Sequence, residues 1–431
     1  MKKFQVIVAC FICIFVIFSV FYYFAHKETI FYEQNKSVIN IRLYSNWSSD
    51  NLEGQCFQKI IDNFNNANPD INIVNDVQLG DDYFHQLELD FCSDNEPDIF
   101  ISDVNEKTKQ YAELKKIAYY NNYLNDDEKW YESFDKSIWD KVTYNGNVFA
   151  IPLENMYVCV YTNDEILKKC NINAYPETYE QLKNNISVIK NNNYIPFAFS
   201  TLENKLLLFN VIIGKYGGRF YSDYNVFGTD KINPNFIKSV QYLKEMYKIG
   251  AFPKDMYNMT ENEINELFLN GKAAFIVRDS GFLNVIYNQE NDIYKNVSVH
   301  GFPSIEGESS LNNSFLYGIS KNSLFISSKA VGDKAKEKAI IRFIKYLTSI
   351  ENTKKIKTGL GAITSAFANI YENDDVVAKF NGNFIYSFKE TVDMPYNKID
   401  LDSWNYLKTK LPMYFDDRIE CDDLFMENRG S

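Results

Sequence analysis

The stretch that decides the fold runs from residue 39 to residue 102 and opens with INIRLY at 39–44. The alternation in that segment predicts a strand, and INIVNDV at 71–77 and DIFIS at 98–102 predict two more. Apolar residues at helical spacing separate these strands, namely Phe57, Ile60, Ile61 and Phe64 in the first gap and Tyr83, Leu87 and Phe91 in the second. This β-α-β-α-β order predicts a parallel sheet with helical crossovers, and therefore an α/β fold.

Open parallel sheets bind ligands beyond the carboxyl ends of their strands. The first predicted strand ends next to Trp47, and the third ends at Asp103. An indole ring packs on the C–H face of a sugar, and a carboxylate accepts hydrogen bonds from its hydroxyls, so both residues are candidate ligand contacts. The alternatives are that Trp47 packs in the core and that Asp103 caps the following helix.

The middle of the chain continues the α/β pattern. A β-like run covers 157–161, and a Thr260–Glu263 capping box predicts a helix that Gly271 can end. The strand that follows leads to Arg278 and Phe282, which therefore also point to the ligand-binding edge. The alternative for Arg278 is an ion pair with another surface group.

The N-terminus predicts a membrane anchor. Lys2 and Lys3 precede an almost unbroken apolar run from residue 4 to residue 25, close to the roughly 20 residues of a membrane span. The lysines predict a cytoplasmic start, so the folded part lies outside. We assign residues 1–26 to the anchor and residues 27–37 to a polar stalk. A cleaved signal peptide and lipidation at Cys10 are the alternatives.

Composition and motifs narrow the function. The net charge of −12 and the lack of a basic stripe argue against nucleic-acid binding. Seven cysteines and three histidines show no metal spacing outside the apolar N-terminus, so we expect no metal and no cofactor. No nucleophile elbow or Ser-His-Asp order is present, and we expect a binding protein rather than an enzyme. Glycoside hydrolysis is a weaker alternative. Ferric-ion binding by Tyr119 and Tyr120 is another, and we expect the segment that carries these two residues to be a surface helix.

Short segments in consistent order resemble one family, the extracellular solute-binding proteins of ABC importers in their maltose-binding-like group 1. The segments are 144–152 (YNGNVFAIP), 161–164 (YTND), 176–179 (PETY), 270–275 (NGKAAF), 302–303 (FP) and 343–347 (FIKYL). In the second segment, Thr-Asn-Asp stands where the family usually has Asn-Lys-Asp. Together the segments place most of residues 38–415 within the resemblance.

The resemblance implies an α/β, two-lobed periplasmic-binding-protein-like fold (type II) with a hinge between the lobes, preceded here by an N-terminal hydrophobic helix. Lobe one would comprise 38–152 and 308–360, and lobe two 155–302 and 361–425. The implied ligand is a small solute, with a carbohydrate the leading candidate. The implied partner is an ABC permease; a membrane sensor is the alternative. The protein would work at the extracytoplasmic face of the cell membrane.

The resemblance also implies which residues hold the ligand. Trp47 and Asp103 would contribute from lobe one, and Asn155 or its neighbour Glu154 from the hinge. Phe282 would replace a Trp that is common in the family, which keeps stacking area but loses an N–H donor. Trp404 matches a sugar-stacking Trp of the family. Its alternative is a core position, because Leu401, Trp404 and Leu407 are spaced for one helix face.

Overall fold

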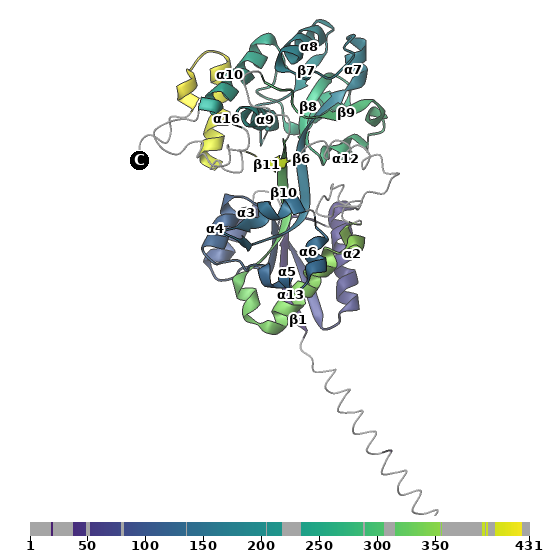
Figure 1. Ribbon diagram of the computed structural model, residues 1–431, viewed down its shortest axis with the longest axis vertical. Coiled ribbons are helices and arrows are strands. Elements are labelled where there is room, and N and C mark those ends of the chain that lie inside the picture. Colours follow the sequence, from purple (N-terminus) through teal and green to yellow (C-terminus); the bar gives the residue numbers. More distant parts are fainter. Residues whose placement is uncertain are drawn as a thin grey trace, which may run out of the picture.

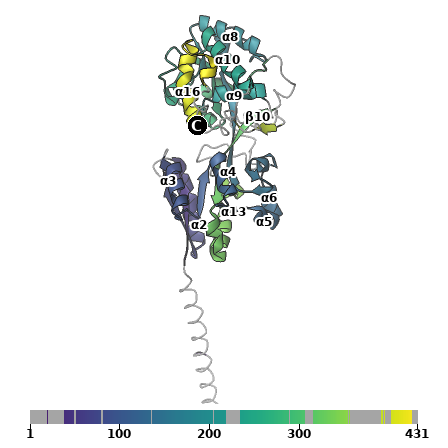
Figure 2. The same cartoon turned by 90° about the vertical axis from the view of Figure 1, so that its left-hand side faces the viewer.

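The chain folds into two α/β lobes that stand one above the other in Figure 1 and, after a quarter turn, in Figure 2. The computed structural model describes residues 38–48, 52–78, 82–134, 136–203, 205–217, 234–287, 289–305, 315–353 and 401–424, together with Ser19, Lys355, Glu390–Val392 and Met394. Apart from Ser19, the predicted anchor and stalk lie outside these residues. Within the described part, no helix combines the length and the apolar character needed to cross a membrane.

Lobe one, the lower body in Figure 1, is built around a core that joins residues before position 154 with residues of the segment 324–347. Its elements are β1 (Ile39–Ser45), α2 (Leu52–Ala67), β2 (Ile71–Val77), α3 (Asp82–Cys92), β3 (Ile99–Ser102), α4 (Glu106–Glu113), α5 (Asn121–Asn125), α6 (Glu128–Glu132), the 3₁₀ helix η1 (Lys136–Val142), β4 (Thr143–Tyr144), β5 (Asn147–Val148), the 3₁₀ helix η4 (Ser328–Gly332) and α13 (Lys334–Leu347).

The opening β-α-β-α-β unit of lobe one is confirmed. β1 pairs in parallel with β2 on one side and with β3 on the other. The apolar face of α2 is buried, including Phe57 and Phe64, because helical spacing puts these residues on the side that faces the sheet. The helix ends at Ala67, directly before Asn68-Pro69, since proline restricts the backbone of the residue before it.

Lobe two, the upper body in Figure 1, has its own apolar clusters, which extend from Tyr157 to Leu424. Its elements are α7 (Asp164–Lys169), α8 (Tyr179–Asn191), β7 (Ile195–Ala198), α9 (Leu207–Gly217), α10 (Pro234–Ile249), α11 (Glu261–Leu269), β8 (Ala273–Asp279), α12 (Phe282–Tyr287), the 3₁₀ helix η3 (Ile293–Asn296), β9 (Val297–His300), α16 (Leu401–Phe415) and the 3₁₀ helix η6 (Cys421–Leu424). The short strand β11 (Glu390–Val392) pairs with the first residues of β10.

Helix boundaries in lobe two follow local signals. Thr178 caps α8 and Thr260 caps α11, each in a capping box that satisfies backbone N–H groups at the start of the helix. Gly271 follows α11 with a φ of +64°, a left-handed conformation that glycine adopts without steric cost. The predicted capping box and the predicted helix end are therefore confirmed.

Two long strands, β6 (Ile151–Asn163) and β10 (Phe315–Ile326), connect the lobes (Figure 1). The sheet order is β2-β1-β3-β10-β6-β8-β7, so one hydrogen-bonded sheet continues through both lobes. The first half of β6 pairs with β10, and its second half pairs with β8 and β9. The strand β6 passes from lobe one into lobe two without a break. No break in the secondary structure therefore marks the lobe boundary predicted between residues 152 and 155, and that boundary stays a prediction.

One expectation for lobe one is wrong. The segment with Tyr119 and Tyr120 is not a surface helix; Ile117 forms a β-bridge with Ser327, and Tyr120 is completely buried. The Tyr119 hydroxyl donates to the Ala112 carbonyl and the Tyr120 hydroxyl to the Leu324 carbonyl. The two hydroxyls are thus used separately in backbone hydrogen bonds. The described residues also contain no group of three or more acidic, His or Cys side chains suited to a metal ion.

Candidate functional site at the junction of the lobes

Strand ends from both lobes meet at the junction of the lobes. Asp103 directly follows β3 in lobe one, and Lys205 lies between β7 and α9 in lobe two. The Lys205 Nζ is 3.7 Å from the Asp103 Oδ2, so the two side chains form an ion pair between the lobes. A second contact places the Lys141 Nζ of lobe one 5.9 Å from the centre of the Tyr157 ring. The edge of the lobe-one sheet at which the sequence predicts ligand binding therefore lies next to lobe two.

Asp103 is held on the hinge side as well. Its Oδ1 accepts a hydrogen bond from the backbone N–H of Asn322 in β10, at 3.2 Å. Asn322 has a φ of +53°, a left-handed conformation inside a strand, at the one place where the β10–β6 register skips a residue. Asn tolerates this conformation better than most residues. Asp103 does not cap α4, because that role belongs to Asn105, whose side chain accepts from the Thr108 N–H. The carboxylate of Asp103 therefore faces the junction.

Residues near Lys205 are held by hydrogen bonds to other parts of lobe two. The Ser200 hydroxyl lies 2.7 Å from the Met256 carbonyl and 2.7 Å from the Met259 carbonyl. The Asn210 amide donates to the Lys205 carbonyl at 2.6 Å. Leu206 is completely buried with a φ of +43°, an unfavourable backbone conformation for a large side chain that persists only when its surroundings impose it. The Asn210 hydrogen bond thus holds the backbone at Lys205 itself.

Arg278 forms an ion pair with Glu203, which lies two residues before Lys205. Its Nη1 donates to the Glu203 Oε2 at 2.8 Å, and its Nε donates to the Asn265 Oδ1 at 2.7 Å. Both charged side chains are buried, with exposed fractions of 5% for Arg278 and 4% for Glu203. Burial raises the pKa of Glu203, and the nearby Arg278 charge opposes that rise. Arg278 thus lies behind the junction in a buried ion pair, not in the surface ion pair considered from the sequence.

The aromatic candidates lie in the cores of the two lobes. Trp47 is 6% exposed and packs edge-on against Phe57, with ring centroids 4.5 Å apart. Phe282 is 5% exposed at the start of α12 and packs edge-on against Tyr161. Trp404 has no exposed surface and stacks near Phe209 in the lobe-two core. The core alternative for Trp404 describes its position, because Leu407 and Leu411 on the same face of α16 are also fully buried.

The two hinge candidates are placed by their backbone. Glu154 pairs with Lys321 and Asn155 pairs with Ser320 across the β6–β10 ladder. Both residues therefore lie where the chain passes between the lobes. The side chain of Asp103 contacts the other lobe through its ion pair with Lys205.

Sequence reasoning missed Lys205, Glu203 and Asn322. The signal for Lys205 is its place a few residues after the short strand 195–198, where a second set of strand ends reaches the junction. For Glu203 and Asn322 no local pattern is available, since their roles depend on partners far away in the sequence.

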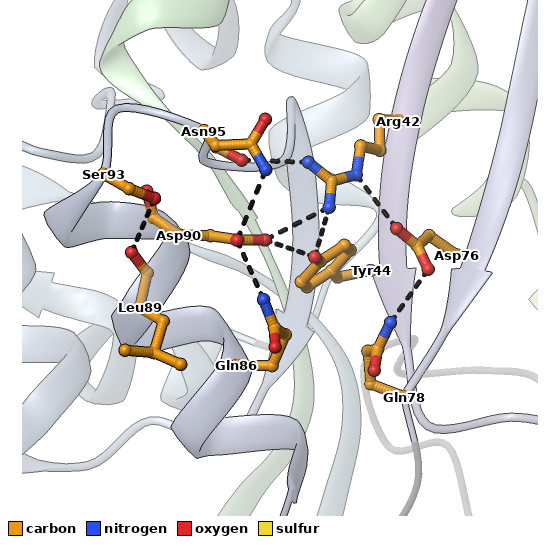
Figure 3. Close-up of polar contacts among 9 residues, drawn as sticks. All are labelled: Arg42, Tyr44, Asp76, Gln78, Gln86, Leu89, Asp90, Ser93 and Asn95. Atoms are coloured by element: carbon orange, nitrogen blue, oxygen red, sulfur yellow. Dashed lines mark hydrogen bonds and ion pairs between the residues drawn. The ribbon is translucent and has the colours of Figure 1, made fainter.

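A second charged cluster lies at the outer edge of lobe one, around Arg42 (Figure 3). Its guanidinium donates to Asp76 at 2.9 Å, to Asp90 at 3.1 Å and to the Asn95 carbonyl at 2.9 Å. Burial alone would raise the pKa of Asp90, but hydrogen bonds from Tyr44, Gln86 and Asn95 and the Arg42 charge outweigh it, and that pKa is lowered. The cluster joins β1, β2 and α3.

A groove of about 710 Å³ adjoins this cluster and is lined by Asn40, Ile41, Arg42, Val74, Asn75, Asp76, Val77, Asp98 and Lys336. Its charged groups are paired with protein partners: Arg42 with Asp76, and Lys336 with Asp98 at 2.9 Å. Because the two charges within each ion pair neutralise one another, we interpret the groove as a structural feature of the sheet edge. The junction of the lobes remains the candidate site.

A comparison with protein-family models shows to which family the chain belongs. Residues 48–354 match the model of the bacterial extracellular solute-binding proteins. The chain belongs to this family. As a bacterial extracellular solute-binding protein it works outside the cytoplasm and captures a solute, and the family resemblance seen in the sequence is confirmed. No curated protein sequence matches the chain.

Solved structures share the two-lobed fold of this solute-binding protein. One comes from a study of xylan utilization by Caldanaerobius polysaccharolyticus, with 21% identity, a TM-score of 0.75 and coverage of 90% of this chain and 98% of the other. A chitin oligosaccharide binding protein has 17% identity, a TM-score of 0.77 and coverage of 90% and 96%. Maltose-bound MalE3 of T. maritima has 17% identity, a TM-score of 0.68 and coverage of 90% and 97%. The predicted α/β two-lobed fold is confirmed.

Proposed function

We propose that this solute-binding protein captures a carbohydrate, most simply an oligosaccharide, between its lobes and delivers it to an ABC importer. The observation that carries the proposal is the contact of Asp103 and Lys205 from opposite lobes at the strand ends. A solute placed there touches both lobes at once and therefore stabilises the arrangement in which they are close. Carboxylate and ammonium groups are also suitable hydrogen-bond partners for sugar hydroxyls.

The choice of carbohydrate is supported by the solved structures with the same fold. Their names refer to xylan utilization, chitin oligosaccharide and maltose. Among the residues marked from the sequence, we propose Asp103 as a direct contact, with Glu154 and Asn155 as neighbours on the hinge strand. Trp47, Phe282 and Trp404 are buried, and Arg278 supports the segment that carries Lys205; we propose these four as supporting residues rather than direct contacts.

We further propose that residues 1–26 anchor the protein in the membrane and that residues 27–37 are its stalk. β1 begins at Ile39, directly after that segment, so lobe one is the tethered lobe. The importer in the same membrane is then the partner that receives the solute, and presentation to a membrane sensor is the alternative. We propose that the solute is bound and released unchanged, without catalysis.

A thermal-shift panel tests the proposed function. We expect the melting temperature of the folded part to rise by several degrees with xylotriose, chitotriose or maltotriose, since a ligand at 100 times its Kd stabilises the protein by about 2.7 kcal/mol. Amino acids and short peptides at the same concentrations serve as controls. The proposal fails if these controls raise the melting temperature and no oligosaccharide does.

A further inference from the structure

The cross-lobe ion pair joins one negative and one positive side chain that are equally accessible. Asp103 and Lys205 each have 29% of the side chain exposed, and their charged atoms are 3.7 Å apart. This distance is longer than a direct hydrogen bond, so both groups retain donor and acceptor capacity for another molecule. A polar group that enters here meets a carboxylate and an ammonium together.

Hydrogen bonds hold the carboxylate of Asp103 and the backbone of Lys205. The hinge N–H of Asn322 orients the Asp103 carboxylate. On the other lobe, the Asn210 amide donates to the carbonyl of Lys205 itself, and Glu203, two residues before Lys205, forms the buried ion pair with Arg278. A pre-organised pair loses little conformational freedom when it binds a solute. The Asp103 carboxylate and the backbone that carries Lys205 are therefore in place before a solute arrives.

We propose that Asp103 and Lys205 form a charge-compensated pair that contacts the solute directly and restricts it to uncharged, hydroxyl-bearing molecules. The inference rests on the proposed function and specifies its substrate class. A neutral hydroxyl can donate to the carboxylate and accept from the ammonium without disturbing their attraction. A solute carboxylate gains from Lys205 but is repelled by Asp103, and a solute amine meets the reverse, so neither charge is favoured.

Removing one partner uncovers the charge of the other. In Asp103→Asn, Lys205 becomes an uncompensated cation at the junction and attracts an anionic saccharide. In Lys205→Gln, Asp103 becomes an uncompensated anion and attracts a cationic one. Because both groups are partly hydrated, we expect each uncovered charge to change affinity for the matching probe by about three- to tenfold.

The test measures dissociation constants by calorimetry for three kinds of trisaccharide. Xylotriose, N,N′,N″-triacetylchitotriose and maltotriose are the neutral probes, trigalacturonic acid is the anionic probe and the glucosamine trimer is the cationic probe. The wild-type protein is expected to prefer a neutral probe over both charged ones. Asp103→Asn should then gain affinity for trigalacturonic acid, Lys205→Gln for the glucosamine trimer, and the double variant for neither.

Lys107→Gln is the matched control, because Lys107 pairs with Glu88 at 2.5 Å and both partners belong to lobe one. It should leave all affinities unchanged. The inference is overturned if the wild type binds a neutral probe while the single variants change affinity for all probes alike, or not at all. If no probe binds the wild type, the proposed function itself fails. The two failures are therefore distinguishable. Unchanged circular dichroism of the variants shows that they are folded.

Discussion

The buried ion pair between Arg278 and Glu203 allows a quantitative test of how the junction is supported. We expect Arg278→Met to destabilise the protein by about 3–5 kcal/mol, because it leaves the Glu203 carboxylate buried without its counter-charge. Glu203→Leu should have a similar effect, since it leaves the Arg278 guanidinium buried. It also removes the acceptor of the Ser200 N–H, 3.0 Å from the Glu203 Oε1.

The double variant distinguishes a buried ion pair from two independent contacts. Replacing both charges by apolar groups of similar size removes the desolvation penalty together with the attraction, so its effect is often close to neutral. The Ser200 N–H would still lack its acceptor, which costs about 1–3 kcal/mol. We therefore expect the double variant to be more stable than either single variant.

Urea unfolding followed by far-UV circular dichroism measures these free energies by linear extrapolation. Lys107→Met, which breaks an exposed ion pair with side chains 44% and 51% accessible, is the control and should cost less than about 1 kcal/mol. The reasoning is refuted if the losses of the two single variants add up in the double variant, or if each single loss is as small as that of the control.

Four further outcomes follow from the structure. Trp404→Ala should destabilise the protein by about 3–5 kcal/mol, as expected for a fully buried Trp, and a variant of unchanged stability in urea titration would show that the ring is not in the core. Thr178→Ala should cost about 1 kcal/mol by the same titration through loss of the α8 cap, whereas Thr178→Ser should retain stability. Burial lowers the pKa of His300, which stacks on Tyr175, to about 4. Because the folded pKa lies below the unfolded value, the contribution of neutral His300 to stability is complete above pH 6.5 and is lost as the pH falls toward 4. We expect a loss of about 1–2 kcal/mol between pH 7 and pH 5. The variant His300→Phe should reduce that loss in thermal melts. Arg42→Met should destabilise lobe one by about 2–4 kcal/mol because Asp90 stays buried without its counter-charge; a loss no larger than that of Lys107→Met in urea would contradict this.

The position of Trp404 changes how variants of the proposed site are designed. If Trp47 and Trp404 contacted the ligand, as the resemblance implies, their removal would abolish sugar binding and leave the fold intact. Both indoles lie in the lobe cores, so such a double variant would lose binding through unfolding. Substitutions at Asp103 and Lys205 avoid this problem, because both side chains are partly exposed and lie outside the apolar clusters.

Features that depend on neighbours along the chain can be predicted from the sequence alone. Periodicity predicted the strands at 39–44 and 71–77, and Thr260 and Gly271 marked the two ends of α11. These signals are local: side chains alternate along a strand, a capping side chain reaches N–H groups one turn away, and glycine accepts a positive φ. The parallel order of the first strands followed from the same local patterns through the rule for crossovers.

Only the tertiary structure decided which polar and aromatic residues reach the junction. A Trp after a strand and a Trp on a helix look alike in sequence whether they face a ligand or a core. The strand pattern predicts Arg278 at the ligand-binding edge, but its partner Glu203 lies 75 positions away, and the Asn322 that orients Asp103 lies 219 positions away. Such pairings depend on how the two lobes pack through β6 and β10, and the information for that packing is spread over the whole chain.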